Sequence, residues 1–177
     1  MVFLLRWPDQ AMTKESKSYM SHRIDSIDAR IVKLLQEDGR MAYAEIARRI
    51  GDVTERVVRH RIKRMLEEHI IRVSAVVNPS AVGFDVTADV WIETDASATT
   101  EVASAITHLE QVSYISYSTG DQNISMQMHA TDLTELHHLV TEGISKMPGV
   151  RRTTITIIPV TLKDIHQWEI PSRVIVD

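Results

Sequence analysis

The spacing of apolar residues changes once along the chain, from three and four residues in the first part to two in the second. Between residues 24 and 69 the spacing is helical, and a first stripe consists of Ile27, Ile31, Leu34 and Leu35. Such a stripe predicts an amphipathic helix. Asp25 is a favourable residue for its N-cap, and Gly39 a favourable one for its end.

Two more helices are expected before residue 69. Ile46, Ala47 and Ile50 form the apolar face of a short second helix that Gly51 ends. Thr54 is the expected N-cap of a third helix, and the residues predicted to face inward are Val57, Val58, Ile62, Met65 and Leu66. Three helices joined by short turns are typical of a helix–turn–helix domain.

Charge makes the third helix distinctive. The stretch from Arg40 to Arg64 holds eight Lys and Arg against three acids, a net charge of +5 in a chain whose net charge is −4. A basic region on an acidic protein indicates a surface that faces a polyanion, and DNA is the leading candidate. The alternative is an ordinary three-helix bundle with a solvated cationic face. The outward face of the third helix carries Arg56, Arg59, His60 and Lys63, with Arg61 and Arg64 on its flanks.

From Phe84 onward the pattern predicts strands alternating with helices. Val86, Ala88, Val90 and Ile92 alternate with polar residues, as in a strand with one buried face. A helix is expected through Val102, Ile106 and Leu109, with its cap within residues 97–100. Strands are expected at 112–119 and through Ile124, Met126 and Met128. A second helix from Asp132 would bury Leu133, Leu136, Leu139, Val140 and Ile144, and a last strand would span 150–160.

The order β-α-β-β-α-β predicts a ferredoxin-like unit with both helices on one face of the sheet. The expected fold class is therefore α+β, a winged-type helix–turn–helix domain followed by a ferredoxin-like domain. The other sheet face would expose Trp91 and the row Ser125, Gln127 and His129, so we expect a partner subunit to cover it in at least a dimer. The predicted divisions are a flexible extension (1–23), the helix–turn–helix domain (24–69), a connector strand and linker (70–83), the ferredoxin-like domain (84–163) and a tail (164–177).

Composition excludes several classes of site. The chain has no cysteine, so disulfides, iron–sulfur clusters, thiol nucleophiles and cysteine-ligated zinc are excluded. No stretch approaches the about 18 consecutive apolar residues that span a membrane, and the first residues lack the features of a signal peptide. We expect a cytoplasmic protein without a metal or other cofactor.

Several short motifs together resemble one family. They are Ile24-Asp25-x-x-Asp28, Asp38-Gly39-Arg40, Glu45-Ile46-Ala47, Arg61-Ile62-Lys63-Arg64, Thr119-Gly120-Asp121 and Pro148-Gly149-Val150. In this combination the chain resembles the Lrp/AsnC, or feast/famine, family of transcriptional regulators over about residues 24–163. The resemblance implies an N-terminal DNA-binding domain, a connector strand that pairs between subunits, and a C-terminal domain for effector binding and assembly.

The resemblance also implies partners and sites. Such proteins form dimers that associate further, often to octamers, and bind small molecules, typically amino acids, between dimers near the glycine turn. The implied contacts to double-stranded DNA are Arg40, Thr54, Arg56, Arg59, His60, Arg61, Lys63 and Arg64. Arg56, Arg59 and His60 are predicted to contact bases, and Arg61 has the alternative role of an ion pair at the core edge. The implied effector residues are Ser118, Gly120, Asp121, Gln122 and Asn123. Asn123 stands where the family commonly has an acid, and His69 where it usually has a glycine.

Three rival functions differ from a ligand-controlled regulator. One is an architectural DNA-binding protein that responds to no effector, and another is an assembly protein whose DNA-binding domain no longer works. The third is an enzyme similar to siroheme decarboxylases, with roles for His108, His129, His137 and His138. Adjacent His137 and His138 would point about 100° apart on a helix, a poor geometry for chelation, and we expect no enzyme activity.

Overall fold

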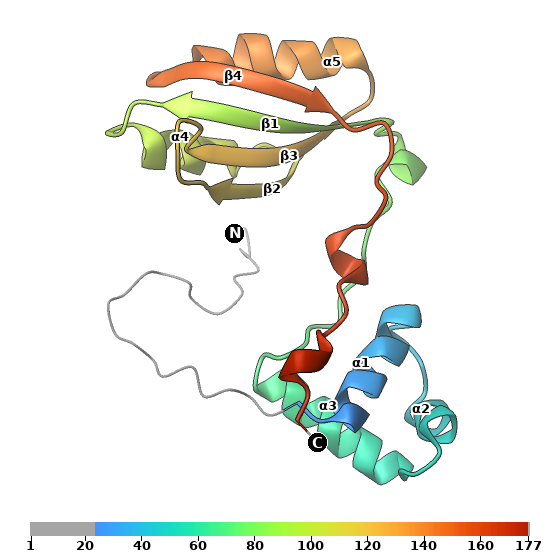
Figure 1. Cartoon of the computed structure of the whole chain (residues 1–177). Coiled ribbons are helices and arrows are strands. Elements are labelled where there is room, and N and C mark those ends of the chain that lie inside the picture. The colour runs from blue at the N-terminus through green and yellow to red at the C-terminus, as the bar shows by residue number, and fades with distance from the viewer. Residues whose placement is uncertain (1–23, 177) are drawn as a thin grey trace. The chain divides into compact units, whose positions relative to one another are not determined.

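The computed structural model describes residues 24–176, which form two compact units (Figure 1). The first unit joins the residues up to Ala75 with the C-terminal segment from Lys163, and the second spans Val76–Leu162. The predicted N-terminal extension, 1–23, lies outside the described residues.

The first unit contains the three predicted helices, α1 (Ser26–Glu37), α2 (Tyr43–Ile50) and α3 (Glu55–Glu67). Asp25 caps α1 through a reciprocal capping box with Asp28. Gly51, with φ of 94°, ends α2, and the Thr54 hydroxyl accepts a hydrogen bond from the Val57 N–H at the start of α3. The predicted caps are confirmed, and they explain why the helix boundaries follow from the sequence.

One apolar core holds these helices together. The prediction that Val57 and Leu66 lie in this core is wrong, because Val57 is 37% exposed and Leu66 is 40% exposed. They lie at the edges of the apolar stripe of α3, where α1 and α2 no longer cover the helix. The buried residues are Ile24, Ile31, Met41, Ile46, Ala47, Ile50, Val58, Ile62 and Met65.

The connector after α3 does not form the expected strand within a single chain. Residues 71–78 belong to no helix or strand, and a 3₁₀ turn follows at Ser80–Val82. Val73, Val76 and Val77 are more than half exposed. A strand requires a neighbouring strand for its hydrogen bonds, and residues 24–176 offer this segment none.

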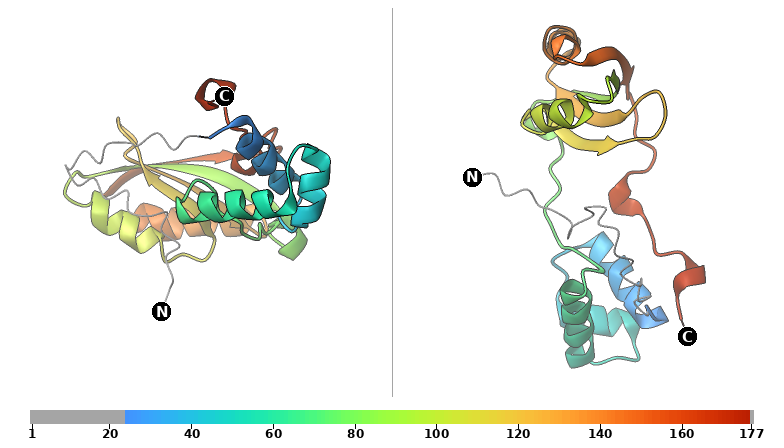
Figure 2. Two further views of the ribbon diagram at one scale, coloured as in Figure 1. Left: turned by 90° about the horizontal axis from the view of Figure 1, so that it is seen from below. Right: turned by 90° about the vertical axis from the view of Figure 1, so that its left-hand side faces the viewer.

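The second unit is an antiparallel four-stranded sheet in the order β2-β3-β1-β4, with helices on one face (Figures 1 and 2). This order and the chain path confirm the ferredoxin-like prediction. The elements are β1 (Val86–Thr94), α4 (Thr99–Ile106), β2 (Val112–Tyr117), β3 (Ile124–Ala130), α5 (Leu133–His138) and β4 (Val150–Ile157). The second helical segment continues beyond α5 as a π-helix (Leu139–Gly143) and a 3₁₀ turn (Ile144–Lys146).

The core between sheet and helices uses the predicted alternation, with Ala88, Val90 and Ile92 fully buried on β1. Leu133, expected to be buried, is 56% exposed because it is the first residue of α5. The N-cap of α4 is Ala98, whose side chain makes no capping bond. The last strand ends before Pro159, which lacks the N–H that a ladder needs.

The opposite sheet face carries the polar residues that the alternation placed there. The Trp91 side chain is 36% exposed, and Ser125, Gln127 and His129 are half-buried. Gln127 donates to Asp89 at 3.1 Å, and His129 Nδ1 lies 3.0 Å from the Thr87 hydroxyl. Partial burial lowers the pKa of His129. Over the described part of the chain, no helix has the length and apolar character needed to cross a membrane.

Candidate functional site

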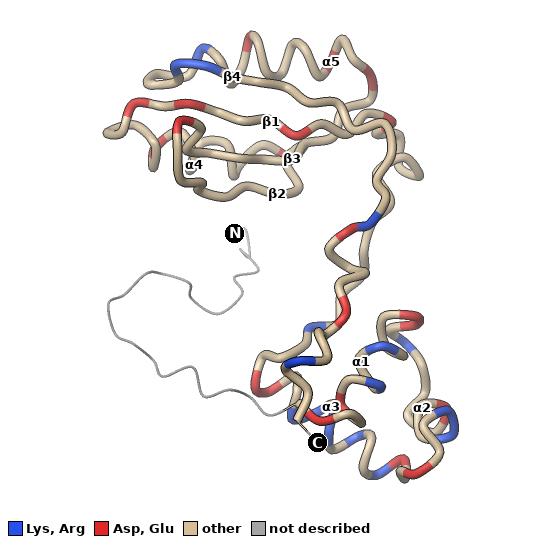
Figure 3. Tube along the Cα trace, in the orientation of Figure 1, with Lys and Arg blue, Asp and Glu red and all other residues tan. Residues whose placement is uncertain are grey.

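The exposed face of α3 is the first candidate site. Arg56, Arg59, His60 and Lys63 are all exposed there, and Figure 3 shows basic residues interspersed with acids along α2 and α3. Thr54 lies at the start of the helix as its N-cap. Arg40 is exposed in the turn after α1, where its N–H donates to the Asp38 carboxylate at 2.9 Å.

Two of the predicted DNA contacts turn inward instead. Arg61 Nη1 lies 2.6 Å from Asp25 Oδ2 and 2.9 Å from Asp28 Oδ1, and Arg64 Nη2 lies 2.5 Å from Asp28 Oδ2. Asp28 is fully buried. Burial opposes ionisation of Asp25, but the Asp28 N–H and the Arg61 guanidinium outweigh it and lower its pKa. The geometry matches the predicted alternative for Arg61, an ion pair at the core edge.

Neighbouring acids engage two cations on the outward face. Arg59 pairs with Glu55 at 2.7 Å, and its guanidinium lies 5.6 Å from the centre of the Tyr43 ring. Lys63 lies 3.6 Å from Glu67. Among residues 24–176, Arg56 and His60 have no ion-pair or hydrogen-bonding side chain assigned to them. They line a surface hollow together with the exposed Val57, beside Asp25, Arg61 and Arg64.

The second candidate site is a depression of about 570 Å³ on the open sheet face. Three of the predicted effector residues line it: Ser118, Asp121 and Gln122. Gly120 occupies the turn itself with φ of 123°, a conformation that favours glycine. The remaining lining residues are Trp91 and Glu93 from β1, Thr119 from the turn, and Arg152 and Thr154 from β4.

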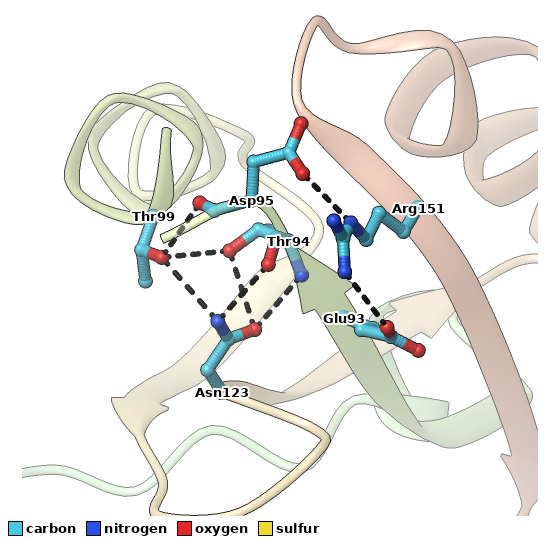
Figure 4. A network of polar contacts seen from close by, with 6 residues as sticks. All are labelled: Glu93, Thr94, Asp95, Thr99, Asn123 and Arg151. Atoms are coloured by element: carbon cyan, nitrogen blue, oxygen red, sulfur yellow. Dashed lines mark hydrogen bonds and ion pairs between the residues drawn. The ribbon is translucent and has the colours of Figure 1, made fainter. Parts of the chain in front are cut away.

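Asn123, the fifth predicted effector residue, does not line the depression, and its side chain points toward Thr94 at the end of β1 (Figure 4). Its Oδ1 accepts from the Thr94 N–H at 2.9 Å, and its Nδ2 donates to the Thr94 carbonyl at 3.3 Å. The Thr99 hydroxyl lies 3.4 Å from Nδ2. The amide therefore ties the glycine turn to β1 and α4, and a ligand would reach it only by displacing these bonds.

Sequence reasoning missed Glu93 and Arg152 in the depression. Glu93 shares its face with Trp91 by strand alternation, which was a usable signal. Arg152 comes opposite Glu93 only through the register between β1 and β4. That register joins strands separated by two helices and two strands, so no local pattern reveals it.

The histidines considered for an enzyme are dispersed. His129 lies on β3, His137 and His138 end α5, and the His108 ring bonds the Ser104 carbonyl after α4. In the region that the structure covers, no three His, Asp or Glu side chains gather in a group that would hold a metal ion.

Comparison with known proteins matches both units to family models. The model of the AsnC-type helix-turn-helix domain matches residues 24–66, and that of the Lrp/AsnC ligand binding domain matches residues 87–167. An uncharacterized HTH-type transcriptional regulator of Pyrococcus abyssi is 37% identical, over 82% of this chain and 90% of its own. The HTH-type transcriptional regulator FL11 of the same organism is 33% identical, over 83% of this chain and 97% of its own.

A solved structure agrees with both units. The feast or famine regulatory protein from M. tuberculosis, complexed with L-methionine, is 29% identical with a TM-score of 0.72. That match covers 83% of this chain and 99% of the other. With both domains in order and relatives above 30% identity along most of its length, this chain belongs to the Lrp/AsnC family of transcriptional regulators.

Proposed function

We propose that this regulator reads a specific DNA sequence through the exposed face of α3, chiefly with Arg56 and His60. The observation that supports this is the division of the basic residues on α3. Arg61 and Arg64 are held by Asp25 and Asp28, whereas Arg56 and His60 project from the outer face without such partners among the described residues.

The chemistry of this face suits the major groove. A free guanidinium binds guanine O6 and N7 through two hydrogen bonds, and an exposed apolar side chain such as Val57 contacts the thymine methyl group. Arg59 requires its contacts to Glu55 and Tyr43 to loosen before it binds a base. We assign Arg40 and Lys63 to phosphates, where long exposed cations add affinity without sequence information.

The test is fluorescence anisotropy of the full-length protein on DNA from upstream of its own gene, across a salt series. We expect affinity to fall steeply with salt concentration and to survive excess unrelated DNA. Arg56→Ala and His60→Ala should each weaken specific binding by about tenfold. Lys146→Ala is the matched control, since it removes one charge from the second unit. If excess unrelated DNA abolishes binding to the upstream DNA entirely, the architectural role would be indicated instead.

We further propose that the depression in the second unit binds a small zwitterion such as an amino acid, and that the bound ligand alters DNA affinity or assembly. Arg152 supplies a cation for a carboxylate, and Asp121 and Glu93 supply anions for an ammonium group. The M. tuberculosis relative complexed with L-methionine supports this ligand class.

Isothermal titration with L-methionine and a panel of other amino acids tests the ligand. We expect saturable binding of at least one of them, weakened by Arg152→Ala and by Asp121→Asn but not by Lys146→Ala. Binding that is unchanged in both site variants would place the ligand elsewhere. Absence of binding across the panel would favour a regulator that responds to no amino acid.

The open sheet face supports self-association. No helix of the described chain covers this face, which carries Trp91 on β1 and the half-buried Ser125, Gln127 and His129 on β3. We propose that a second copy covers it, giving a dimer as the basic unit, and that dimers associate further, up to an octamer.

A further inference from the structure

The C-terminal segment packs with the DNA-binding helices, although more than eighty residues of the second unit separate it from them. From the sequence, this segment was predicted only as a tail, 164–177. In the structure Ile175 forms a parallel bridge with Ile24, and the Val176 N–H donates to the Ile24 carbonyl at 2.8 Å. The two ends of the described chain therefore pair with each other.

The middle of the segment contacts α1. Gln36 Nε2 donates to the Trp168 carbonyl at 2.8 Å and to the His166 carbonyl at 3.4 Å. Lys33 lies 3.5 Å from Glu169, but both side chains are about two-thirds exposed, so this pair adds little stability. The hydrogen bonds from the Gln36 side chain position the segment more than the ion pair does.

Apolar contact supplies the main anchor. Ile170 packs against the core of the helix–turn–helix domain, and Pro171, which follows it, restricts the backbone. Other large residues of the segment stay in solvent, since Ile165 is 80% exposed and Trp168 is 60% exposed. Burial of Ile170 is thus selective, and Ile165 offers a matched control.

The far end of the segment bonds Ile24, the residue next to an ion pair between α3 and the N-cap of α1. Ile24 is only 6% exposed and immediately precedes Asp25, which caps α1 and pairs with Arg61 of α3 at 2.6 Å. A backbone bond that holds Ile24 also restrains the position of the Asp25 carboxylate. The tail and α3 are therefore connected through Ile24 and Asp25, the two residues that precede α1.

The chain leaves and re-enters the second unit at one end of the sheet. The start of β1 lies beside the end of β4, with Ala88 opposite Ile157 and the Ile158 N–H bonded to the Thr87 carbonyl at 2.9 Å. Two connections, around residues 76 and 162, thus join the ligand-binding unit to the DNA-binding unit.

We propose that residues 163–176 act as a strap that completes the DNA-binding unit, positions α3 through Ile24 and Asp25, and gives the ligand-binding unit a second point of attachment. The strap orders the start of α1, and its loss leaves the two units joined by a single connector. The effect on DNA affinity rests on the proposed DNA-binding function, whereas the docking of the strap does not.

Hydrogen exchange of the full-length protein tests the docking directly. In the wild type we expect the C-terminal peptide containing Val176 and the peptide around Ile24 to be protected. Exchange of both at the rate of an unfolded chain would overturn the proposal. Ile170→Asp should remove this protection and weaken DNA binding by about tenfold, while Ile165→Asp should leave both unchanged.

A milder variant serves if Ile170→Asp fails to fold. Gln36→Ala removes only the two side-chain bonds to the strap, so we expect a normal fold with faster exchange of residues 164–176. Unchanged exchange in that variant would overturn the proposal. If the wild type binds no DNA, the proposed function fails, but the exchange measurement still decides whether the strap docks.

Discussion

The guanidinium of Arg61 on α3 lies 2.9 Å from the carboxylate of Asp28, which is fully buried at the start of α1. Arg64 approaches the other oxygen of the same carboxylate. The two arginines thus fix α3 against α1 through one shared carboxylate. Arg61 and Arg64 therefore hold the helices together, and they are not available on the exposed face of α3 that we propose binds DNA.

We expect Asp28→Ala to lower the free energy of unfolding by about 3 kcal/mol, because it leaves two arginines at the core edge without their shared acid. Both arginines retain partial contact with water, at 22% and 33% exposure, which limits the loss. Urea denaturation measures the effect. Exposed Asp52→Ala is the control and should change stability by less than about 0.5 kcal/mol; an equal loss in both variants would contradict the role of Asp28.

Local signals predicted the helices of the first unit well. Asp25, Gly51 and Thr54 each determine a boundary through bonds within a few residues, so their sequence context was sufficient. The burial of Asp28 was not predicted, because an acid in a first turn is equally compatible with exposure near the positive end of a helix dipole. Only the position of α3 shows that Arg61 and Arg64 compensate the charge of Asp28.

Contacts between distant segments limited the prediction of the sites. Asn123 was placed correctly in the glycine turn, but the direction of its side chain depends on Thr94 and Thr99, which precede it by more than twenty residues. The connector failed as a strand in the single chain for the same reason, since strand formation depends on a partner outside the segment. The alternation of apolar and polar residues predicted β1 and β3 correctly, because it depends only on residues within each strand.

Stability should depend on pH through Glu45 at the start of α2. Hydrogen bonds from Arg48 and then Arg49 lower the pKa of Glu45 from 4.5 to about 2. A lowered folded-state pKa means that the stabilisation is present above the unfolded value near 4.5 and is lost as the pH falls through about 2. We therefore expect Glu45→Gln to reduce the melting temperature near neutral pH, with the difference shrinking below about pH 4.

Salt provides the check on this prediction. All three side chains are at least one-third exposed, so added salt should reduce the difference between wild type and Glu45→Gln at neutral pH. A difference that persists unchanged at acidic pH would show that the variant acts through helix propensity or packing rather than charge.

His69 should be replaceable by glycine with a gain in stability. It follows the C-terminal end of α3 with φ of 56°, a left-handed conformation that favours glycine. Its N–H bonds the Leu66 carbonyl and the next N–H bonds the Met65 carbonyl, the bonding pattern of a Schellman motif. We expect His69→Gly to raise the free energy of unfolding by about 1 kcal/mol, measured by urea denaturation. His69→Ala retains the strain and should bring no such gain.

Asn123→Asp should destabilise the second unit, even though an acid is common at this position in the family. The Asn123 Nδ2 donates to the Thr94 carbonyl, and a carboxylate would put an oxygen against that acceptor. Thr94 is 4% exposed, so water replaces the lost donor poorly. We expect a loss of about 1–3 kcal/mol in thermal or urea unfolding. Gln122→Glu, one residue away and exposed, is the control; equal effects would mean that added charge, not the lost bond, is responsible.

Trp91 should control self-association through the open sheet face. It lies opposite Thr154 of β4 and Ser125 of β3, and it is the largest apolar side chain on that face. A partner sheet would bury it, so Trp91→Arg should place an unpaired charge in the interface and shift the protein toward monomer. Light scattering coupled to size-exclusion chromatography measures the mass. Tyr117→Arg is the control, because Tyr117 is 63% exposed and pairs with the core residue Ile124 at the sheet edge. A monomeric wild type would contradict the interface, and a dimer unchanged by Trp91→Arg would move it to another surface.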